Sequence, residues 1–315
     1  MSSTDSTLKT GVWKGHAAML FANMVWGIMA PISKNVLLSG QVNSIALSAL
    51  RIAGGALLFL IMGFILPKSV APKEHVAPKD LFKMFLASVL MISCNQGLYI
   101  MGVGLTSPVD ATVMCTITPI FTMLLAAAIL AMPITWMKVA GVAVGLGGAL
   151  MLVMSTEGGT AEASDPILGD ALCLGAQLCA ALYYVLFKDI ITRYSPWTMM
   201  KWMFWFSGLT YVPACLPWLA EVDYPAVSGW IWWSLAYIVV FASFIGYLLI
   251  PFSQRLLKPT VVSMYTYFQP VFSALLAAVL GFGVFGMGKI AATLLIFLGV
   301  ALVTRSPGKE RVSKV

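Results

Sequence analysis

The stretch PIFTMLLAA at residues 119–127 returns as PVFSALLAA at residues 270–278. The two stretches share their proline, their phenylalanine and their Leu-Leu-Ala-Ala ending, and both lie inside long apolar segments. The same shift of 151 positions, from 119 to 270, pairs Lys138 with Lys289. Self-similarity over this distance indicates that the chain consists of two related halves.

The composition of the chain is that of a protein embedded in a lipid bilayer. Of its 315 residues, 60% are hydrophobic and 10% are charged, whereas a soluble domain has about 25% charged residues. A water-soluble fold of this size could not bury so much apolar surface. A transmembrane helix takes roughly 20 apolar residues, so ten helices would use about 200 residues. That leaves short loops and tails and no room for a soluble catalytic domain.

Ten apolar segments are separated by charges, prolines and glycines. We expect helices because each segment is long and continuous, whereas the strands of an outer-membrane barrel are alternating segments of about 10 residues. Three segments begin with an N-cap residue and a proline, at Ser107-Pro108, Asp165-Pro166 and Ser195-Pro196. The expected fold class is an all-α polytopic membrane protein with ten transmembrane helices. They span approximately residues 15–37, 43–66, 82–102, 108–131, 135–154, 167–187, 196–218, 229–251, 259–281 and 286–304.

The repeat predicts that the two halves have opposite orientations in the membrane. Helices one to five correspond to helices six to ten, and five is an odd number, so the second half enters the bilayer from the other side. Inverted-topology repeats are typical of secondary transporters, whose site lies near the midplane between the halves. The predicted domains are a first repeat (15–154), an extracytoplasmic linker (155–166), a second repeat (167–304) and a cytoplasmic tail (305–315).

The charge distribution predicts which side of the membrane the loops occupy. The net charge is +7, and with a cytoplasmic N-terminus all but three of the 19 Lys and Arg residues lie in cytoplasmic segments. The exceptions are Lys34, Arg51 and Lys289. Basic loops mark the cytoplasmic side, so we expect both termini in the cytoplasm of a multi-pass protein. The basic residues therefore report topology and not a nucleic-acid partner.

Several motifs resemble one transporter family. Residues resembling an EamA domain are Trp26-Gly27, Lys34, Arg51, Thr118-Pro119, Gly141, Gly145, Gly147 and Gly148, and Gln269-Pro270 through Gly299 resembles the same part of a second copy. Over roughly residues 15–304 the chain is similar to the drug/metabolite transporter superfamily, as an EamA family transporter with two EamA domains. The resemblance implies two inverted five-helix halves and transport of small metabolites, often outward across the bacterial inner membrane. Family members often carry Glu after helices four and nine, where this chain has Met132 and Phe282.

Neutral polar side chains near the middle of the apolar segments are candidates for a substrate cavity, because unpaired polar groups are costly in hydrocarbon. Asn23 matches Gln177 across the repeat, as Thr118 matches Gln269. The alternative is hydrogen bonding between neighbouring helices, at about 0.6–2 kcal/mol for each bond. The predicted cavity residues are Asn23, Trp26, Asn95, Gln96, Tyr99, Thr116, Gln177, Tyr267 and Gln269, with Tyr183, Tyr184, Tyr247 and Tyr265 as further aromatic candidates.

Two basic residues and two prolines within the segments complete the predicted site. Lys34 is a candidate gate residue or contact for a substrate anion, and Arg51 either snorkels, pairs with a carbonyl or binds an anionic substrate group. Pro119 and Pro270 each free the carbonyl four residues earlier, those of Cys115 and Thr266. The prolines either only kink their helices or offer these carbonyls to a substrate.

These features favour a secondary transporter that exports small neutral or zwitterionic metabolites, amino-acid-like or aromatic among them, by alternating access. An exchanger of phosphorylated sugars or nucleotide sugars is the alternative, and a membrane receptor or structural protein is the alternative outside transport. An enzyme is not expected, because the chain has no HExxH, Walker A or dinucleotide-binding motif. The five cysteines lie in apolar segments and are expected to be buried hydrophobes. We therefore expect no cofactor and no metal, and the expected partners are a small-molecule substrate and the lipid bilayer.

Overall fold

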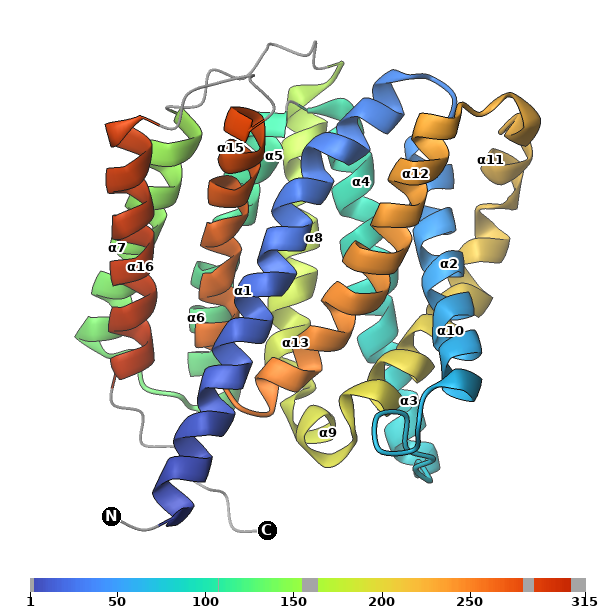
Figure 1. Cartoon of the computed structure of the whole chain (residues 1–315). Helices are drawn as coiled ribbons and strands as arrows, with labels where there is room; N and C mark the ends of the chain where they lie inside the picture. Colours follow the sequence, from blue (N-terminus) through green and yellow to red (C-terminus); the bar gives the residue numbers. More distant parts are fainter. Residues whose placement is uncertain (1–2, 107, 155–163, 280–285, 307–315) are drawn as a thin grey trace.

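Helices are the only regular structure in the residues that the computed structural model describes, which are 3–106, 108–154, 164–279 and 286–306. The first repeat consists of α1 (Ser3–Leu38), α2 (Ser44–Ile65), α3 (Pro78–Ser88), η1 (Val89–Cys94), α4 (Asn95–Leu105), α5 (Pro108–Cys115), α6 (Thr118–Leu130) and α7 (Trp136–Met154). The second repeat consists of α8 (Pro166–Leu186), α9 (Lys188–Arg193), α10 (Pro196–Ala214), α11 (Leu216–Ala220), η2 (Tyr224–Ala226), α12 (Gly229–Tyr237), η3 (Ile238–Ile245), α13 (Gly246–Gln254), α14 (Pro259–Met264), η4 (Tyr265–Tyr267), α15 (Phe268–Val279) and α16 (Met287–Arg305). Consecutive elements such as α3, η1 and α4 continue one another, so the expected transmembrane segments are all helical (Figure 1).

Most of these segments are suited to a bilayer. Within the described residues, eight helices are long and apolar enough to cross a membrane. The two other expected spans are α10, in which Lys201 and several aromatic residues lower the hydropathy, and α14–α15, which the 3-10 turn η4 interrupts. Figure 1 shows α10 running from one face of the bundle to the other beside α2.

Side-chain caps fix where several helices begin. The Asp165 carboxylate accepts a hydrogen bond from the Leu168 amide (3.1 Å), and the Ser195 hydroxyl accepts one from the Thr198 amide (3.2 Å). Each cap satisfies an amide that has no partner inside the helix, and the following proline needs no such partner. These two predicted caps are therefore confirmed, while Ser107 lies outside the described residues.

The contacts between helices repeat in exchanged form. α1 packs against α13 and α15, and α8 packs in the same way against α4 and α6. At the first of these contacts Gly15 meets Leu256 and Leu257, and at its counterpart Gly169 meets Gly102. Helix one therefore contacts helices eight and nine as helix six contacts helices three and four, which is the arrangement of an inverted repeat.

α7 and α16 close the bundle at one end and join the two halves directly. A Cβ atom at Gly299 of α16 would lie 2.6 Å from the Gly141 carbonyl oxygen and 2.6 Å from the Gly145 amide nitrogen of α7. Only glycine permits two helices to approach this closely. The glycines shared by the fifth and tenth segments thus form a close backbone contact between the repeats.

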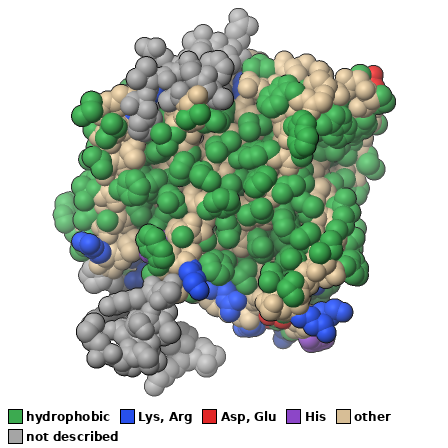
Figure 2. Space-filling view, viewed as in Figure 1, with side chains coloured by type: hydrophobic (Ala, Val, Ile, Leu, Met, Phe, Trp, Pro, Cys, Tyr) green, Lys and Arg blue, Asp and Glu red, His purple; other side chains and the backbone are tan. Residues whose placement is uncertain are grey.

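The outer surface has the pattern of a membrane protein. The beginning of α1 and the end of α16 lie at the same face, which we call the lower face from its place in Figure 1. In Figure 2 hydrophobic side chains cover the middle of the molecule, and Lys and Arg side chains gather along the lower edge. An apolar surface of this size would be unstable in water, so the predicted fold class is confirmed: the protein is an all-α polytopic membrane protein.

The helix interiors differ from the expectation of regular spans. The third and eighth segments each contain a π-helical stretch, Val89–Cys94 and Ile238–Ile245. The two stretches end 151 residues apart, at equivalent positions of the repeat. Such stretches leave carbonyl groups without their usual α-helical partners and are frequent at functional sites. Their matched positions indicate that both halves have the same irregularity at the same depth.

Candidate functional site

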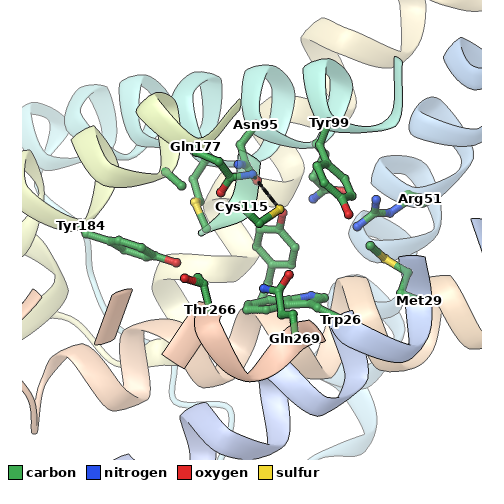
Figure 3. Close-up of a pocket in the computed structure, with 14 residues that line it drawn as sticks. Trp26, Met29, Arg51, Asn95, Tyr99, Cys115, Gln177, Tyr184, Thr266 and Gln269 are labelled. Carbon is green, nitrogen blue, oxygen red and sulfur yellow. Dashed lines mark hydrogen bonds between the residues drawn. The ribbon is translucent and has the colours of Figure 1, made fainter. Parts of the chain in front are cut away.

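A central cavity lies between the two halves, enclosed by elements of both. It holds about 540 Å³ of empty space, including the part that is open to solvent. Residues of α4 and α8 lie on one side of the cavity and residues of α1 and α15 on the opposite side, with Arg51 of α2 at one end (Figure 3). The lining residues are Trp26, Met29, Arg51, Met91, Asn95, Gln96, Tyr99, Cys115, Gln177, Ala180, Tyr184, Tyr247, Thr266 and Gln269.

Most of the predicted site residues meet at this cavity. The lining contains nine of them, namely Trp26, Arg51, Asn95, Gln96, Tyr99, Gln177, Tyr184, Tyr247 and Gln269, while Tyr183 and Tyr265 are not among the lining residues. Asn23 stands behind the wall and holds Gln269. Thr116, Tyr267 and Lys34 are not among the lining residues. The cavity is thus lined by amides and aromatic rings, with Arg51 as its charged side chain.

Two hydrogen-bonded pairs, which join equivalent helices of the repeat, hold the two glutamines of the second half. Gln269 Nε2 donates to Asn23 Oδ1 at 2.9 Å, and Thr118 Oγ1 lies 2.8 Å from Gln177 Oε1. In each pair the glutamine lines the cavity and its partner stands behind it. The Thr118 hydroxyl also lies 2.8 Å from the Cys115 carbonyl oxygen, and since a hydroxyl has one hydrogen it donates to one of the two acceptors at a time.

The other amides are placed by helices α4 and α8. Asn95 Nδ2 donates to the Ala176 carbonyl at 2.8 Å, and the Tyr247 hydroxyl donates to Asn95 Oδ1 at 3.2 Å. Asn95 therefore connects α4 to both α8 and α13. Gln96 is 1% exposed, and neither of its amide atoms has a partner at hydrogen-bond distance in the described structure. A buried amide without partners is costly, so its polar atoms remain available to a group inside the cavity.

Trp26 is held against the π-helical stretch of the eighth segment. Its indole Nε1 donates to the Ala242 carbonyl oxygen at 2.9 Å. Its ring meets the Tyr247 ring edge-on, with 5.6 Å between the centroids and an angle of 73°. A Cβ atom at Gly246 would lie 3.0 Å from the indole nitrogen, so glycine leaves room for this contact. The irregular carbonyl of η3 and the small residue after it together fix the orientation of the tryptophan.

The predicted kinks at Pro119 and Pro270 take the form of tight turns just before each proline. Thr116 N bonds to the Val113 carbonyl (3.0 Å) before Pro119, and the 3-10 turn Tyr265–Tyr267 precedes Pro270. The Thr116 hydroxyl donates back to the Val113 carbonyl, and Tyr267 is fully buried with its hydroxyl 3.4 Å from the Val142 carbonyl. These contacts direct both side chains away from the cavity.

Two of the buried basic residues, Lys34 and Arg51, have opposite surroundings. Lys34 is 4% exposed, and its ammonium donates to the carbonyl oxygens of Val103 (3.0 Å) and Thr106 (3.1 Å) at the end of α4. Arg51 is 2% exposed and lines the cavity. Its Nε donates to Ser243 Oγ at 3.3 Å, while its Nη1 has no hydrogen-bond partner in the described structure. Lys34 therefore completes a helix end, and Arg51 presents an unpaired charge.

Some lining residues have no polar signal in the sequence. Met29, Met91 and Ala180 line the cavity but are indistinguishable from the many apolar residues of the spans. Ala180 could have been found from the repeat, because the shift that pairs Asn23 with Gln177 also pairs it with Trp26. In the described residues no group of three or more His, Cys, Asp or Glu side chains is placed to bind a metal ion.

Comparison with known proteins agrees with this arrangement. The chain is 24% identical over 267 residues to an "Uncharacterized transporter" of Archaeoglobus fulgidus, which covers 83% of this chain and 88% of that protein. It is 22% identical over 240 residues to the "Uncharacterized transporter YyaM" of Bacillus subtilis, covering 76% of this chain and 78% of that protein. A solved structure titled "Crystal structure of protein" has the same fold, with a TM-score of 0.71, 18% identity and coverage of 94% of this chain and 96% of that one.

The family profile accounts for both halves. The profile of the EamA-like transporter family matches residues 13–154 and again residues 167–305. These two matches cover the two structural repeats on either side of the linker region. The resemblance of the motifs is thereby confirmed, and the protein belongs to the EamA-like transporter family, as a membrane transporter of the drug/metabolite transporter superfamily.

Proposed function

We propose that the protein exports small neutral or zwitterionic metabolites by alternating access around the central cavity. The observation that carries this proposal is the matched placement of Gln269 on Asn23 and of Gln177 on Thr118, with both glutamines facing one cavity between inverted halves. An amide offers donors and an acceptor without a charge. Such groups bind neutral and zwitterionic polar groups weakly enough to release them.

Two matched sets of contacts are candidates for the gates. Near the upper face α4 is tied to α1 through Lys34 and to α8 through the Thr106 hydroxyl, which donates to Asp170 Oδ1 at 2.7 Å. Near the lower face α13 is tied to α1 by Ser253 Oγ, which donates to the Gly15 carbonyl at 3.0 Å. Its last residue, Gln254, donates to the Tyr184 carbonyl of α8 at 3.3 Å.

The two sets are related by the repeat, because α4 of the third segment corresponds to α13 of the eighth and each bonds to both α1 and α8. In the proposed cycle, one set breaks while the other holds, so the cavity opens to one side at a time. The two prolines and the turns before them are the flexible points of the fourth and ninth segments. Lys34 acts in this proposal as a gate residue through the end of α4.

The orientation in the membrane follows from the charges at the two faces. The lower face carries most of the basic residues of the described loops. Because basic loops stay in the cytoplasm, we place the lower face and both termini in the cytoplasm and the protein in the inner membrane of a bacterium. An exchanger of phosphorylated sugars has less support, because such anions call for several cations and Arg51 is the charged residue among those lining the cavity.

Flux measured with purified protein in proteoliposomes tests the proposal. We expect uptake of at least one member of a panel of amino acids, nucleobases and sugars above the level of protein-free vesicles, with trans-stimulation by the same compound. The Gln269→Ala variant, reconstituted at the same density, is the matched control and should transport several-fold less. No flux of any compound from monodisperse protein would contradict the proposal and favour a receptor or structural role.

A further inference from the structure

Arg51 is a buried charge without an acidic partner. It comes from α2, and the groups that face it are the hydroxyl of Ser243 in η3 and the phenol rings of Tyr99, Tyr211 and Tyr247 from α4, α10 and α13. No carboxylate occurs among the residues that line the cavity beside it. Its Nε donates to Ser243 Oγ, while its Nη1 has no hydrogen-bond partner within the described structure.

This situation is energetically costly unless another molecule completes it. Burying a guanidinium without a counter-ion removes its hydration without providing a compensating electrostatic interaction. Lys34 shows how the same protein satisfies a buried cation, with two carbonyl oxygens at 3.0 and 3.1 Å. Arg51 Nη1 has no such acceptor. The missing partner is therefore an acceptor that enters through the cavity, and the planar fork of a guanidinium fits a carboxylate with two parallel hydrogen bonds.

The surroundings of Arg51 describe the rest of the ligand. In Figure 3 the guanidinium extends into the cavity between Met29 and Tyr99, with Trp26 on the neighbouring wall. The amides of Gln177 and Asn95 lie on the far side of these apolar groups. Gln96, which is also buried and without partners, adds a second unoccupied polar position. The order along the cavity is thus a cation, an apolar and aromatic wall, and then amides.

We infer that the transported compounds are amphipathic carboxylates whose carboxylate pairs with Arg51. Their apolar or aromatic body lies against Trp26 and Met29, and a second polar group, such as an amino group, contacts the amides. This inference rests on the proposed transport function and specifies its substrate class. A single carboxylate on an apolar body is the anion that one unpaired guanidinium can neutralise, whereas a phosphate of higher charge would leave excess negative charge in the cavity.

Matched ligand pairs test the inference. Leucine and phenylalanine are each compared with their carboxamides, which keep the body and the amino group but lose the negative charge. Binding is measured as ligand-dependent thermal stabilisation of the purified protein, and flux is measured separately in proteoliposomes. The variants are Arg51→Gln, Arg51→Lys and the control Lys201→Gln, which removes a half-buried cation from α10 that lies over the Trp202 ring, 5.3 Å from its centroid.

We expect the wild type and Lys201→Gln to bind each carboxylate at least about tenfold more tightly than its amide, the effect of losing charge-assisted hydrogen bonds. Arg51→Gln should lower this ratio to near one without lowering the melting temperature of the ligand-free protein, because it removes an unpaired charge. Arg51→Lys, which keeps the charge but not the fork, should give an intermediate ratio and provides the test if the glutamine variant does not fold. An unchanged ratio in these variants, or no binding of any carboxylate to the wild type, would overturn the inference. Selective binding without flux would instead overturn the transport proposal and leave the inference standing.

Discussion

The two halves of the protein share a scaffold but differ in the chemistry they bring to the cavity. The pairs Gln269–Asn23 and Gln177–Thr118 join equivalent helices, but both cavity-facing glutamines belong to the second half and both of their partners to the first. In both halves a π-helical stretch interrupts the helix that packs on the first helix of the other half. The shared features position the backbone alike in both halves, as the proposed alternating-access cycle requires.

The basic residues of the paired helices α2 and α10 show the difference. Each helix carries one basic residue within two turns of its start, Arg51 in α2 and Lys201 in α10. Arg51 is buried at the cavity without an acidic partner, whereas Lys201 is partly exposed, lies over the Trp202 ring and interacts with Glu74. The inferred amphipathic substrate would account for this asymmetry, because a ligand with different ends needs different partners at each end. Under the proposed function, the symmetric parts serve movement and the asymmetric parts serve selection.

Breaking the contact between the halves is expected to have the largest effect. Gly299→Leu would drive a side chain into the backbone of Gly141 and Gly145, where even a Cβ atom would lie at 2.6 Å. Overpacking against backbone costs at least about 3 kcal/mol here, so we expect little monodisperse protein by size-exclusion chromatography. Gly147→Leu is the control on α7, because nothing lies within 4 Å of a Cβ atom at that position. Normal folding of Gly299→Leu would show that α7 and α16 separate without loss of the fold.

The amide pairs are expected to have the next largest effect. Gln269→Ala and Asn23→Ala each remove the 2.9 Å hydrogen bond and should lower flux several-fold, with a melting temperature close to that of the wild type. Gln177→Ala, at the other cavity-facing glutamine of the second half, should have a similar effect if the two pairs contribute equally, and a smaller one would show that the pair with Asn23 dominates. Flux per folded molecule and thermal unfolding are measured on the same preparations. Loss of stability with normal flux would identify these amides as links between helices.

Much of this arrangement could be predicted from the sequence. Composition and the repeat at 119–127 and 270–278 indicate the fold class, because apolar length and internal similarity are properties of the chain itself. The mid-membrane amides were predictable for a related reason, since hydrocarbon leaves them only a cavity or a neighbouring helix.

The remaining features depend on tertiary contacts. Lys34 and Arg51 are both single basic residues in apolar spans. What distinguishes them is that the Lys34 ammonium has carbonyl acceptors at the end of α4, which the sequence does not reveal. The π-helical stretches have no residue pattern of their own, because their hydrogen bonds follow from packing against the opposite half. Thr116 was chosen by depth, but the turn before Pro119 directs its hydroxyl to its own backbone.

Lys34 provides a third test, with a moderate effect. Lys34→Met removes two hydrogen bonds from the end of α4 and should destabilise the protein by about 1–3 kcal/mol. Since the ammonium does not line the cavity, flux of leucine and of its carboxamide should change by the same factor. Lys14→Met, at an exposed position of the same helix, is the control for stability. A change in the preference for leucine over its carboxamide would instead show that Lys34 contacts the substrate. That is the other role that its position in the sequence predicts.

The smallest effect is expected on stability, in a comparison of two carboxylates that lie in equivalent loops on opposite faces. Glu74 accepts hydrogen bonds from the Ser195 amide (3.0 Å) and hydroxyl (2.9 Å) at the start of α10, whereas Glu221 has a 3.4 Å contact with the Asn43 amide at the start of α2. Burial alone would raise the pKa of Glu74, but the hydrogen bonds from Thr198 and Ser195 outweigh it and lower the pKa below its ordinary value. The ionised form is therefore favoured in the folded protein.

The stability that Glu74 contributes is present above the ordinary pKa of a glutamate and is lost as the pH falls through the lowered pKa. Glu74→Gln should lower stability by only about 0.5 kcal/mol at pH 7, because the group is partly solvated, and this difference should shrink as the pH falls below about 4. Glu221→Gln should leave stability at pH 7 unchanged, since its contact is long and exposed. Thermal unfolding at a series of pH values measures both. Equal effects of the two substitutions would show that the loops of the two faces are secured alike, and that the asymmetry between the halves is confined to the cavity.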